Sequence, residues 1–339
     1  MNIYILNTMN SGLDVVNHLL KHISISGVIG LSERDQTDLI SGYVYQKEFC
    51  KKNNLKFIEV SSYSLNNNAD KKLLSSLQID YLIVTGWQRL IPASLIEKCK
   101  AAVIGAHGSP YGITKGRGRS PQNWALILDE PNFEIAIYKI EEGIDSGPVI
   151  SSCNFQYSVF DNIESSYYKV TWHISEMLID FFKKNAKGKI NLQFQDDTDA
   201  TYLPQRLPED GCIDWNRSTK GIYNFIRALS KPYPGSFTTV DNKKVKIFKA
   251  IPFELISEKK FAAGEIANIY NNKDLLVKCK DDFILITDYE VEAGFELTER
   301  MIFNSCSYKE QLQNILDRHR NKYPHLPLNR NLLNHFDRQ

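Results

Sequence analysis

The sequence predicts an α/β fold, with a doubly wound, mostly parallel sheet followed by a smaller C-terminal β-rich domain. Over residues 1–110, short apolar runs alternate with helical stretches, which is the pattern of successive βαβ units. Nearer the end of the chain, turn residues such as Asn271-Asn272 separate strand-like runs. The 339 residues also exceed the roughly 250 to 300 at which a single core stops growing.

The first strands of the sheet are predicted from apolar runs of four or five residues, a length typical of buried strands. They are Ile3–Leu6, Ser26–Gly30, Lys56–Val60, Tyr81–Val84 and Ala102–Ile104, and the helices Gly12–His22, Leu39–Lys52, Ala69–Leu77 and Ala93–Cys99 separate them. Such sheets bind ligands at the carboxyl ends of their strands, at a topological switch point. We expect His107, just after a strand, to lie in that crevice.

The alternation continues through a helix at Ser120–Leu128, a strand at Phe133–Ile140, a strand after Pro148 and an amphipathic helix at Asp161–Asn185. Between Lys187 and Gln205, the residues Gly, Asp, Thr and Pro interrupt any periodicity. We therefore predict an N-terminal domain over residues 1–190, a linker over 191–205, a β-rich domain over 206–305 and a helical tail over 306–339.

The β-rich domain is predicted to begin with a helix at Thr219–Leu229 and a turn at Tyr233–Ser236. Its antiparallel strands are expected at Lys243–Pro252, Gly264–Tyr270, Leu275–Lys280 and Phe283–Glu290. The tail carries a charged helical pattern over Tyr308–His319, which predicts either a docking helix or a frayed terminus.

Composition narrows the classes of partner. The chain has 41 Lys and Arg against 40 Asp and Glu, so no global field would gather nucleic acid or an anionic membrane. The six cysteines are widely spaced and form no Cys-x-x-Cys pair, which predicts free thiols, a reducing compartment and no zinc site. The sequence shows neither a signal peptide nor a long apolar segment, and we expect a cytoplasmic protein without a membrane partner.

A histidine and an aspartate are the strongest candidates for chemistry. Small neighbours such as Gly105 and Gly108 would let a ligand approach His107 closely. Asp145 opens Asp145-Ser146-Gly147 between two predicted strands, where it could reach back to the same sheet edge. A carboxylate beside a histidine fixes its tautomer and stabilises its charged form, which suits a proton shuttle. Alone, an isolated histidine is more often structural, and the aspartate could simply shape its turn.

Two further segments could line the crevice. Lys115, Arg117 and Arg119 alternate with glycines ahead of a helix start at Ser120, where amides and guanidinium groups would hold a phosphate or carboxylate. A solvated basic loop is an equally ordinary interpretation of each side chain. Trp87–Pro92 would suit a flat heteroaromatic ring, or could simply begin the next helix. The first strand is followed by one glycine where a dinucleotide fingerprint needs several, which disfavours NAD.

These residues together resemble the formyltransferase family that uses N10-formyltetrahydrofolate, and within it most closely the sugar N-formyltransferases. A His-Gly-Ser segment that leads into Arg-Gly-Arg-x-Pro-x-Asn-Trp appears here as His107–Ser109 and Arg117–Trp124, and the Asp-x-Gly element as Asp145–Gly147. Arg206–Trp215, Ile226–Ala228 and Pro232–Phe237 resemble the family's stretch between its two domains. The resemblance covers about residues 1–300 and is specific for the family rather than for the substrate.

The resemblance implies a Rossmann-like catalytic domain and transfer of a formyl group from N10-formyltetrahydrofolate, the folate co-substrate. The implied acceptor is the amine of a nucleotide-linked amino-deoxy sugar, used in lipopolysaccharide O-antigen or other surface polysaccharide biosynthesis. It implies catalytic roles for His107, Asp145, Ser109 and Asn123, folate binding by Gln88, Arg89, Leu90, Ile91, Glu141, Glu142, Gly143 and Ile144, and sugar-nucleotide binding by Lys115, Arg117 and Arg119. No metal is required, and a homodimer is our hypothesis for the assembly.

Two departures from the family pattern bear on activity. Gly105 stands where the family carries an asparagine that helps to hold the formyl oxygen, and the loop Pro110–Gly116 is longer. Loss of such a donor typically costs about 100- to 1000-fold in rate. Either Ser109 or Asn123 replaces it, or activity is weak. Methionyl-tRNA formyltransferase, formyltetrahydrofolate hydrolase and an inactive nucleotide-sugar or folate-binding relative are the alternatives, and the net charge of +1 disfavours a nucleic-acid partner.

Overall fold

The computed structural model describes residues 1–33, 40, 42–185 and 190–338. The chain forms two compact units, and each unit is assembled from three segments. Unit 1 comprises Met1–Arg117, Phe133–Phe155 and Tyr167–Ala200, and unit 2 comprises Gly118–Asn132, Gln156–Ser166 and Thr201–Gln339. The boundaries expected at residues 190 and 205 stay a prediction about which parts of the chain fold independently.

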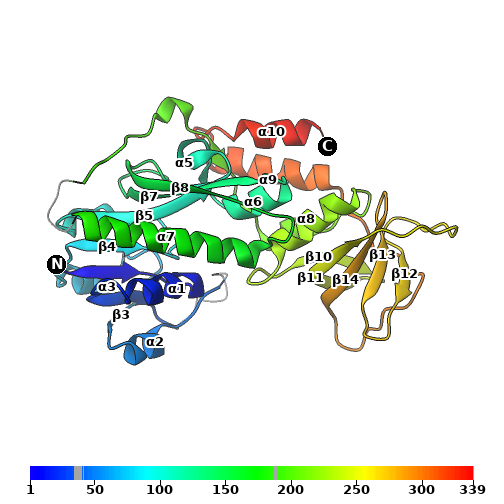
Figure 1. Cartoon of the computed structure of the whole chain (residues 1–339), viewed down its shortest axis with the longest axis horizontal. Helices are drawn as coiled ribbons and strands as arrows, with labels where there is room; N and C mark the ends of the chain where they lie inside the picture. The colour runs from blue at the N-terminus through cyan, green and yellow to red at the C-terminus, as the bar shows by residue number, and fades with distance from the viewer. Residues whose placement is uncertain (34–39, 41, 186–189, 339) are drawn as a thin grey trace. The chain divides into compact units, whose positions relative to one another are not determined.

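Unit 1 is built on a seven-stranded sheet with the order β3-β2-β1-β4-β5-β7-β8 (Figure 1). The strands are β1 (Ile3–Leu6), β2 (Gly27–Leu31), β3 (Lys56–Val60), β4 (Tyr81–Val84), β5 (Ala102–Ser109), β7 (Asn132–Lys139) and β8 (Val149–Gln156). Strands β1 to β5 pair in parallel, whereas β7 runs antiparallel to β5. The strand order reverses between β1 and β4, which confirms the predicted doubly wound α/β class.

Strand β5 is longer than the predicted Ala102–Ile104. Its parallel pairing with β4 ends at Ile104, but the ladder with β7 continues from Ile104 to Ser109. His107 therefore lies inside β5, opposite Ala136, and its expected place after a strand was wrong. The physical reason is that the glycine-rich segment after Ile104 has no strand pattern of its own and becomes a strand only through the hydrogen bonds of β7.

The helices of unit 1 cover both faces of the sheet, because alternate strand residues point to opposite faces. On one face Leu6, Leu82 and Val103 belong to a core that includes Leu74 and Leu95. Those two leucines come from α3 (Asn68–Ser75) and α4 (Ala93–Lys98). The other helices of the unit are α1 (Asn10–Leu19), α2 (Lys47–Lys52), α5 (Gly112–Lys115) and α7 (Ile163–Asn185), whose first residues belong to unit 2.

Helix α7 lies across the sheet (Figure 1), where the rings of Phe181 and Phe182 contact Tyr81. This confirms the amphipathic helix predicted at Asp161–Asn185. The helix predicted at Leu39–Lys52 is shorter, since α2 begins at Lys47, and residues 39 and 41 lie outside the described residues. No helix among the described residues has the length and apolar character that a membrane crossing requires.

Unit 2 contains a five-stranded antiparallel sheet with the order β10-β11-β14-β13-β12. Its strands are β10 (Ser236–Val240), β11 (Lys243–Phe253), β12 (Ile266–Ile269), β13 (Leu275–Lys278) and β14 (Phe283–Val291), and the short strands β6 (Arg117–Gly118) and β9 (Tyr202–Leu203) lie earlier in the chain. Strand β10 was not predicted. It pairs with β11 across Asp241-Asn242, two residues with positive φ of 49° and 60° that suit a tight hairpin turn.

The helices of unit 2 are α6 (Pro121–Ile127), α8 (Thr219–Leu229), α9 (Tyr308–Lys322) and α10 (Arg330–Asp337), with 3₁₀ turns at Asp197–Asp199 in unit 1 and Pro208–Gly211 in unit 2. In helix α9, Leu312 and Leu316 are fully buried, which favours the docking interpretation of the charged tail over fraying. In helix α10, burial and the charges of Arg217 and Arg338 lower the pKa of His335 to about 4.

A disulfide joins Cys212 to Cys306, which corrects the expectation that every cysteine is a free thiol. The two residues are 94 positions apart, so the sequence contained no short Cys-x-x-Cys motif that would predict the disulfide. Cys50, Cys99, Cys153 and Cys279 are free. Burial raises the pKa of the Cys50 thiol to about 11 and that of Cys279 to about 12, which makes both poor nucleophiles.

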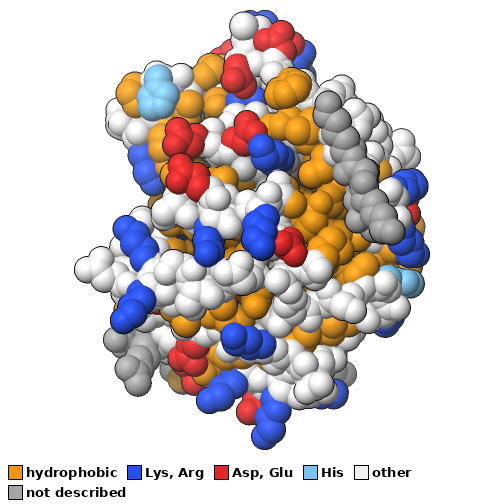
Figure 2. Space-filling view, turned by 90° about the vertical axis from the view of Figure 1, so that its left-hand side faces the viewer, with side chains coloured by type: hydrophobic (Ala, Val, Ile, Leu, Met, Phe, Trp, Pro, Cys, Tyr) orange, Lys and Arg blue, Asp and Glu red, His pale blue; other side chains and the backbone are white. Residues whose placement is uncertain are grey.

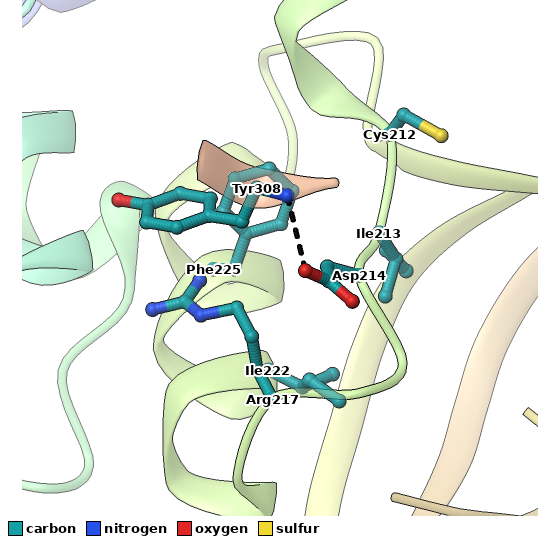
Figure 3. A pocket seen from close by; sticks show the side chains of 7 residues that line it. All are labelled: Cys212, Ile213, Asp214, Arg217, Ile222, Phe225 and Tyr308. Carbon is teal, nitrogen blue, oxygen red and sulfur yellow. Dashed lines mark hydrogen bonds between the residues drawn. The ribbon is translucent and has the colours of Figure 1, made fainter. Parts of the chain in front are cut away.

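Next to Cys212, the start of α9 packs on α8 and the loop before it (Figure 3). The guanidinium of Arg217 lies 3.8 Å from the centre of the Tyr308 ring, and the backbone N–H of Tyr308 donates to Asp214 Oδ2 at 3.0 Å. The depression lined by these residues has a cavity volume of about 0 Å³. These side chains are closely packed inside unit 2 and leave no space for a ligand.

Candidate active site

The predicted histidine–aspartate pair forms within unit 1. The buried His107 has its Nδ1 at 3.4 Å from Oδ2 of the half-buried Asp145. Its other nitrogen, Nε2, lies 2.8 Å from the carbonyl oxygen of Gly116. Because a carbonyl oxygen only accepts hydrogen bonds, Nε2 carries the hydrogen in this arrangement. The carboxylate of Asp145 then faces Nδ1, where it stabilises an imidazolium.

The Asp-x-Gly element owes its glycine to a close backbone approach. A Cβ atom on Gly147 would lie 1.8 Å from the carbonyl oxygen of Lys139, so no other residue fits without moving the loop. Asp145 itself has a left-handed φ of 51°, a conformation that aspartate tolerates better than most residues. The turn between β7 and β8 is thereby folded back so that Asp145 reaches His107 on β5.

Tyr138 is a site residue that the sequence reasoning missed. Its hydroxyl donates to Oδ1 of Asp145 at 2.9 Å, and it stands opposite Gly105 in the β5–β7 ladder. Burial raises the pKa of Tyr138 well above its usual value, and the negative charge and hydrogen bond of Asp145 raise it further. Tyr138 therefore stays protonated and acts as a donor. Tyr138 lies beside Asp145 because of the register between β5 and β7, which the sequence alone does not reveal.

Gln195 is a second residue that was missed, because it lies in the polar segment predicted as a linker. Its Nε2 donates to the carbonyl oxygens of Asp145 at 2.8 Å and Gly147 at 2.7 Å. Its Oε1 accepts from Arg117 at 3.0 Å and from the hydroxyl of Thr114 at 3.0 Å. One amide side chain thus fastens the Asp145 turn to the glycine-rich loop.

The basic residues of the glycine-rich loop have different surroundings. Arg117 is only 2% exposed and pairs with Asp197 at 2.7 Å, so it is not part of a solvated loop. Lys115 is exposed and lies 3.2 Å from Asp199. Arg119 belongs to unit 2, where its backbone N–H donates to the Leu203 carbonyl. Their assignment to a sugar nucleotide stays a prediction.

The two predicted substitutes for the family asparagine also lie in different units. Ser109 is buried in unit 1, and its Oγ accepts from the backbone N–H of Tyr111 at 3.0 Å. Asn123 is buried in unit 2, where its amide donates to the carbonyl oxygen of Ala228 at 2.7 Å. Trp124 beside it donates to the carbonyl oxygen of Pro204. The roles of Ser109 and Asn123 in holding a formyl oxygen stay predictions.

The segments predicted to hold folate lie after β4 and after β7. At the first, Gly86 turns the chain with φ of +68°, where a Cβ would lie 2.3 Å from Asn7 Oδ1. Leu90 is 68% exposed and Arg89 is exposed, whereas Gln88 is half-buried and Ile91 is buried. At the second, Glu141, Glu142 and Gly143 are exposed and Ile144 is half-buried. The assignment of both segments to folate stays a prediction.

Comparison with known proteins identifies two family models along the chain. Residues 25–179 match the formyl transferase model, and residues 207–307 match the formyl transferase C-terminal domain. The bifunctional polymyxin resistance protein ArnA of Wigglesworthia glossinidia brevipalpis is 31% identical over 247 residues, which cover 73% of this chain and 36% of that protein. The chain thus spans about a third of ArnA. Methionyl-tRNA formyltransferase of Caldanaerobacter subterraneus subsp. tengcongensis is 29% identical over 249 residues, covering 73% and 78%.

Solved structures share the fold at low sequence identity. HypX from Aquifex aeolicus in complex with tetrahydrofolic acid has a TM-score of 0.61 and 17% identity, covering 96% of this chain and 58% of that one. WlaRD, a sugar 3N-formyl transferase solved in the presence of dTDP and 5-N-formyl-THF, has a TM-score of 0.58 and 17% identity, covering 84% and 97%. The fold and the two matched models agree with the motifs, and the chain belongs to the formyl transferase family of enzymes.

Proposed function

We propose that this chain moves a formyl group from N10-formyltetrahydrofolate to the amine of a nucleotide-linked amino-deoxy sugar. The proposal rests on the contact between His107 on β5 and Asp145 in the turn between β7 and β8, in a chain of the formyl transferase family. A folate donor is supported by two partly exposed segments, in which Arg89 and Leu90 are exposed in the first and Glu141–Gly143 in the second. It is also supported by the folates named for the HypX and WlaRD structures.

In the proposed reaction, the amine nitrogen attacks the formyl carbon, a new C–N bond forms, and the bond from that carbon to N10 of the folate breaks. The amine loses one proton and N10 gains one. The charged His107 ring can give its Nε2 proton to N10 and then take the amine proton at the same nitrogen. Nε2–H now faces the Gly116 carbonyl at 2.8 Å, and the formyl oxygen would replace that carbonyl as acceptor. Asp145 stabilises the ring while it carries the additional charge.

The choice of a sugar acceptor is supported by the structural neighbours and by charge. WlaRD and a Helicobacter canadensis N-formyltransferase in complex with folinic acid and dTDP-3-aminofucose both share the fold. The face in Figure 2 shows Asp and Glu side chains as well as Lys and Arg, and the net charge of the whole chain is +1. A small acceptor needs no extended basic surface. Surface polysaccharide synthesis is the corresponding proposal for the product.

Methionyl-tRNA formyltransferase is the second candidate, favoured by a specific observation. The curated relatives named methionyl-tRNA formyltransferase match over most of their own length, 78% for the Caldanaerobacter protein. Recognition of tRNA depends on many phosphate contacts and weakens steeply with salt. A transfer-RNA acceptor would therefore show itself by a strong salt dependence of KM, which a sugar nucleotide would show only weakly.

The test measures tetrahydrofolate release from N10-formyltetrahydrofolate by absorbance, against dTDP- and UDP-linked 3-amino and 4-amino sugars, methionyl-tRNA and a no-acceptor control. Formylated sugar, confirmed by mass spectrometry and abolished in His107→Gln but not in the surface control His22→Gln, would support the proposal. Formylation of methionyl-tRNA alone would establish the second candidate. Release without an acceptor indicates a hydrolase, and folate binding without any release indicates an inactive relative.

A further inference from the structure

Gly105 leaves a space that the ring of Tyr138 occupies. The two residues are direct partners in the β5–β7 ladder, so their side-chain positions point to the same face of the sheet. A Cβ atom on Gly105 would lie 3.2 Å from Cζ of Tyr138 and 2.9 Å from Cδ1 of Ile140. These distances are shorter than ordinary van der Waals contacts. A side chain at position 105 would therefore require both Ile140 and the Tyr138 ring to shift.

The ring uses that space to reach the catalytic carboxylate. The Tyr138 hydroxyl lies 2.9 Å from Asp145 Oδ1, while Oδ2 of the same carboxylate lies 3.4 Å from His107 Nδ1. Tyr138 is only 7% exposed, and its hydrogen bond to a carboxylate is charge-assisted. The tyrosine and the histidine thus contact the two oxygens of one carboxylate, and the tyrosine fixes its rotation about the Cβ–Cγ bond.

We propose that Tyr138 is a positioning residue of this active site, which fills the space open at Gly105 and turns Asp145 toward His107. The support from Gln195 reaches only the backbone carbonyls of Asp145 and Gly147. Tyr138 restrains the carboxylate itself, next to a histidine contact that is already long for a hydrogen bond. The kinetic consequence rests on the proposed function, whereas the effect on the His107–Asp145 pair does not.

The first test is Tyr138→Phe, with Tyr157→Phe as the matched control. Tyr157 is equally buried at 8% exposure, and its hydroxyl lies 2.5 Å from Ser166 Oγ in unit 2. Removing the bond to Asp145 should lower kcat about 10- to 100-fold, as expected for a hydrogen bond to a charged group, and change KM for N10-formyltetrahydrofolate less than about twofold. The control should keep its kcat.

A second readout needs no turnover. In protein labelled with ¹⁵N-histidine, the Nδ1 resonance of His107, assigned by its loss in His107→Gln, should move in Tyr138→Phe and stay in Tyr157→Phe. An unmoved resonance together with unchanged kcat would overturn the inference. If no acceptor is formylated by the wild-type protein, the proposed function fails, and the resonance still decides the role of Tyr138.

A reciprocal pair of variants covers the case in which Tyr138→Phe does not fold. Gly105→Ala places a Cβ 3.2 Å from Cζ of Tyr138 and should lower kcat by about tenfold, because the ring must shift away from Asp145. In a Tyr138→Ala background the same substitution should cause less than about a twofold further loss, because the ring is already absent. A further tenfold loss in the double variant would contradict the inference that Gly105 acts through Tyr138.

Discussion

Replacing Asp145 by asparagine removes the charge beside His107 and keeps the shape of the side chain. Two unit charges 3.4 Å apart, the distance between Nδ1 and Oδ2, attract each other by about 5 kcal/mol at an effective dielectric of 20 and by about 1 kcal/mol in water. His107 is buried and Asp145 is half-buried, so the loss should fall between these limits. At about 1.4 kcal/mol per tenfold in rate, Asp145→Asn should lower kcat by about 10- to 1000-fold.

The assay is tetrahydrofolate release at saturating N10-formyltetrahydrofolate, with the acceptor identified in the screen. KM for both substrates should change little, because the charge acts on the protonated ring formed during proton transfer. Asp317→Asn is the control, since it removes a carboxylate that lies 3.0 Å from Arg320 on α9. Near-normal turnover by folded Asp145→Asn would refute the role assigned to the pair, and an equal loss in the control would show an effect of net charge.

Three further predictions concern the loop and the stability of unit 2. Gly147→Ala places a Cβ 1.8 Å from the Lys139 carbonyl and should cost about 2 kcal/mol or more in thermal unfolding, together with a loss of kcat; unchanged values would contradict the required close approach. The pKa of His335 is lowered from 6.5 to about 4, so the unfolded chain takes up a proton first, and stability present above pH 6.5 is lost as the pH falls toward 4. Urea unfolding at pH 7 and pH 4 measures this loss of stability, which should be smaller by up to about 3 kcal/mol in His335→Gln. An equal loss in the variant and the wild-type protein would contradict the prediction. Cys306→Ser removes the disulfide that closes a 94-residue loop and should lower the unfolding free energy by about 2 to 5 kcal/mol. In urea unfolding, the reduced wild-type protein should match this variant. An unchanged urea midpoint in the variant would show that the disulfide does not stabilise the protein.

Much of the fold could be predicted because its elements carry their own local signals. The predicted strands Lys56–Val60 and Tyr81–Val84 coincide with β3 and β4, and the helix at Thr219–Leu229 coincides with α8. Strand β10 was missed because Ser236 and two threonines leave no apolar run, and only the hairpin with β11 makes it a strand. Local patterns therefore located the elements, whereas pairing extended β5 and created β10.

The contact between His107 and Asp145 was predictable because each residue stands beside a local signal in the sequence. His107 lies among small residues on the sheet, and Asp145 opens a turn with a required glycine. Tyr138 and Gln195 carried no such signal. The place of Tyr138 depends on strand register, and that of Gln195 on a segment with neither helical nor strand periodicity. Both act on Asp145 through hydrogen bonds that only the folded chain brings together.

The glycines of this site are best understood through the atoms that occupy the place of their missing side chains. At Gly116, the Oγ of Ser109 lies 1.6 Å from where a Cβ would be. At Gly147, the nearest atom to that position is the carbonyl oxygen of Lys139. At Gly105, the nearest groups are the side chains of Ile140 and Tyr138. In the first two cases the neighbour belongs to the family motif or to the backbone. In the third the neighbours are two side chains, and the hydroxyl of one of them, Tyr138, donates a hydrogen bond to Asp145. Because Gly105 and Tyr138 are cross-strand neighbours in contact, we infer that the effect of Gly105 on activity depends on the position of the Tyr138 ring.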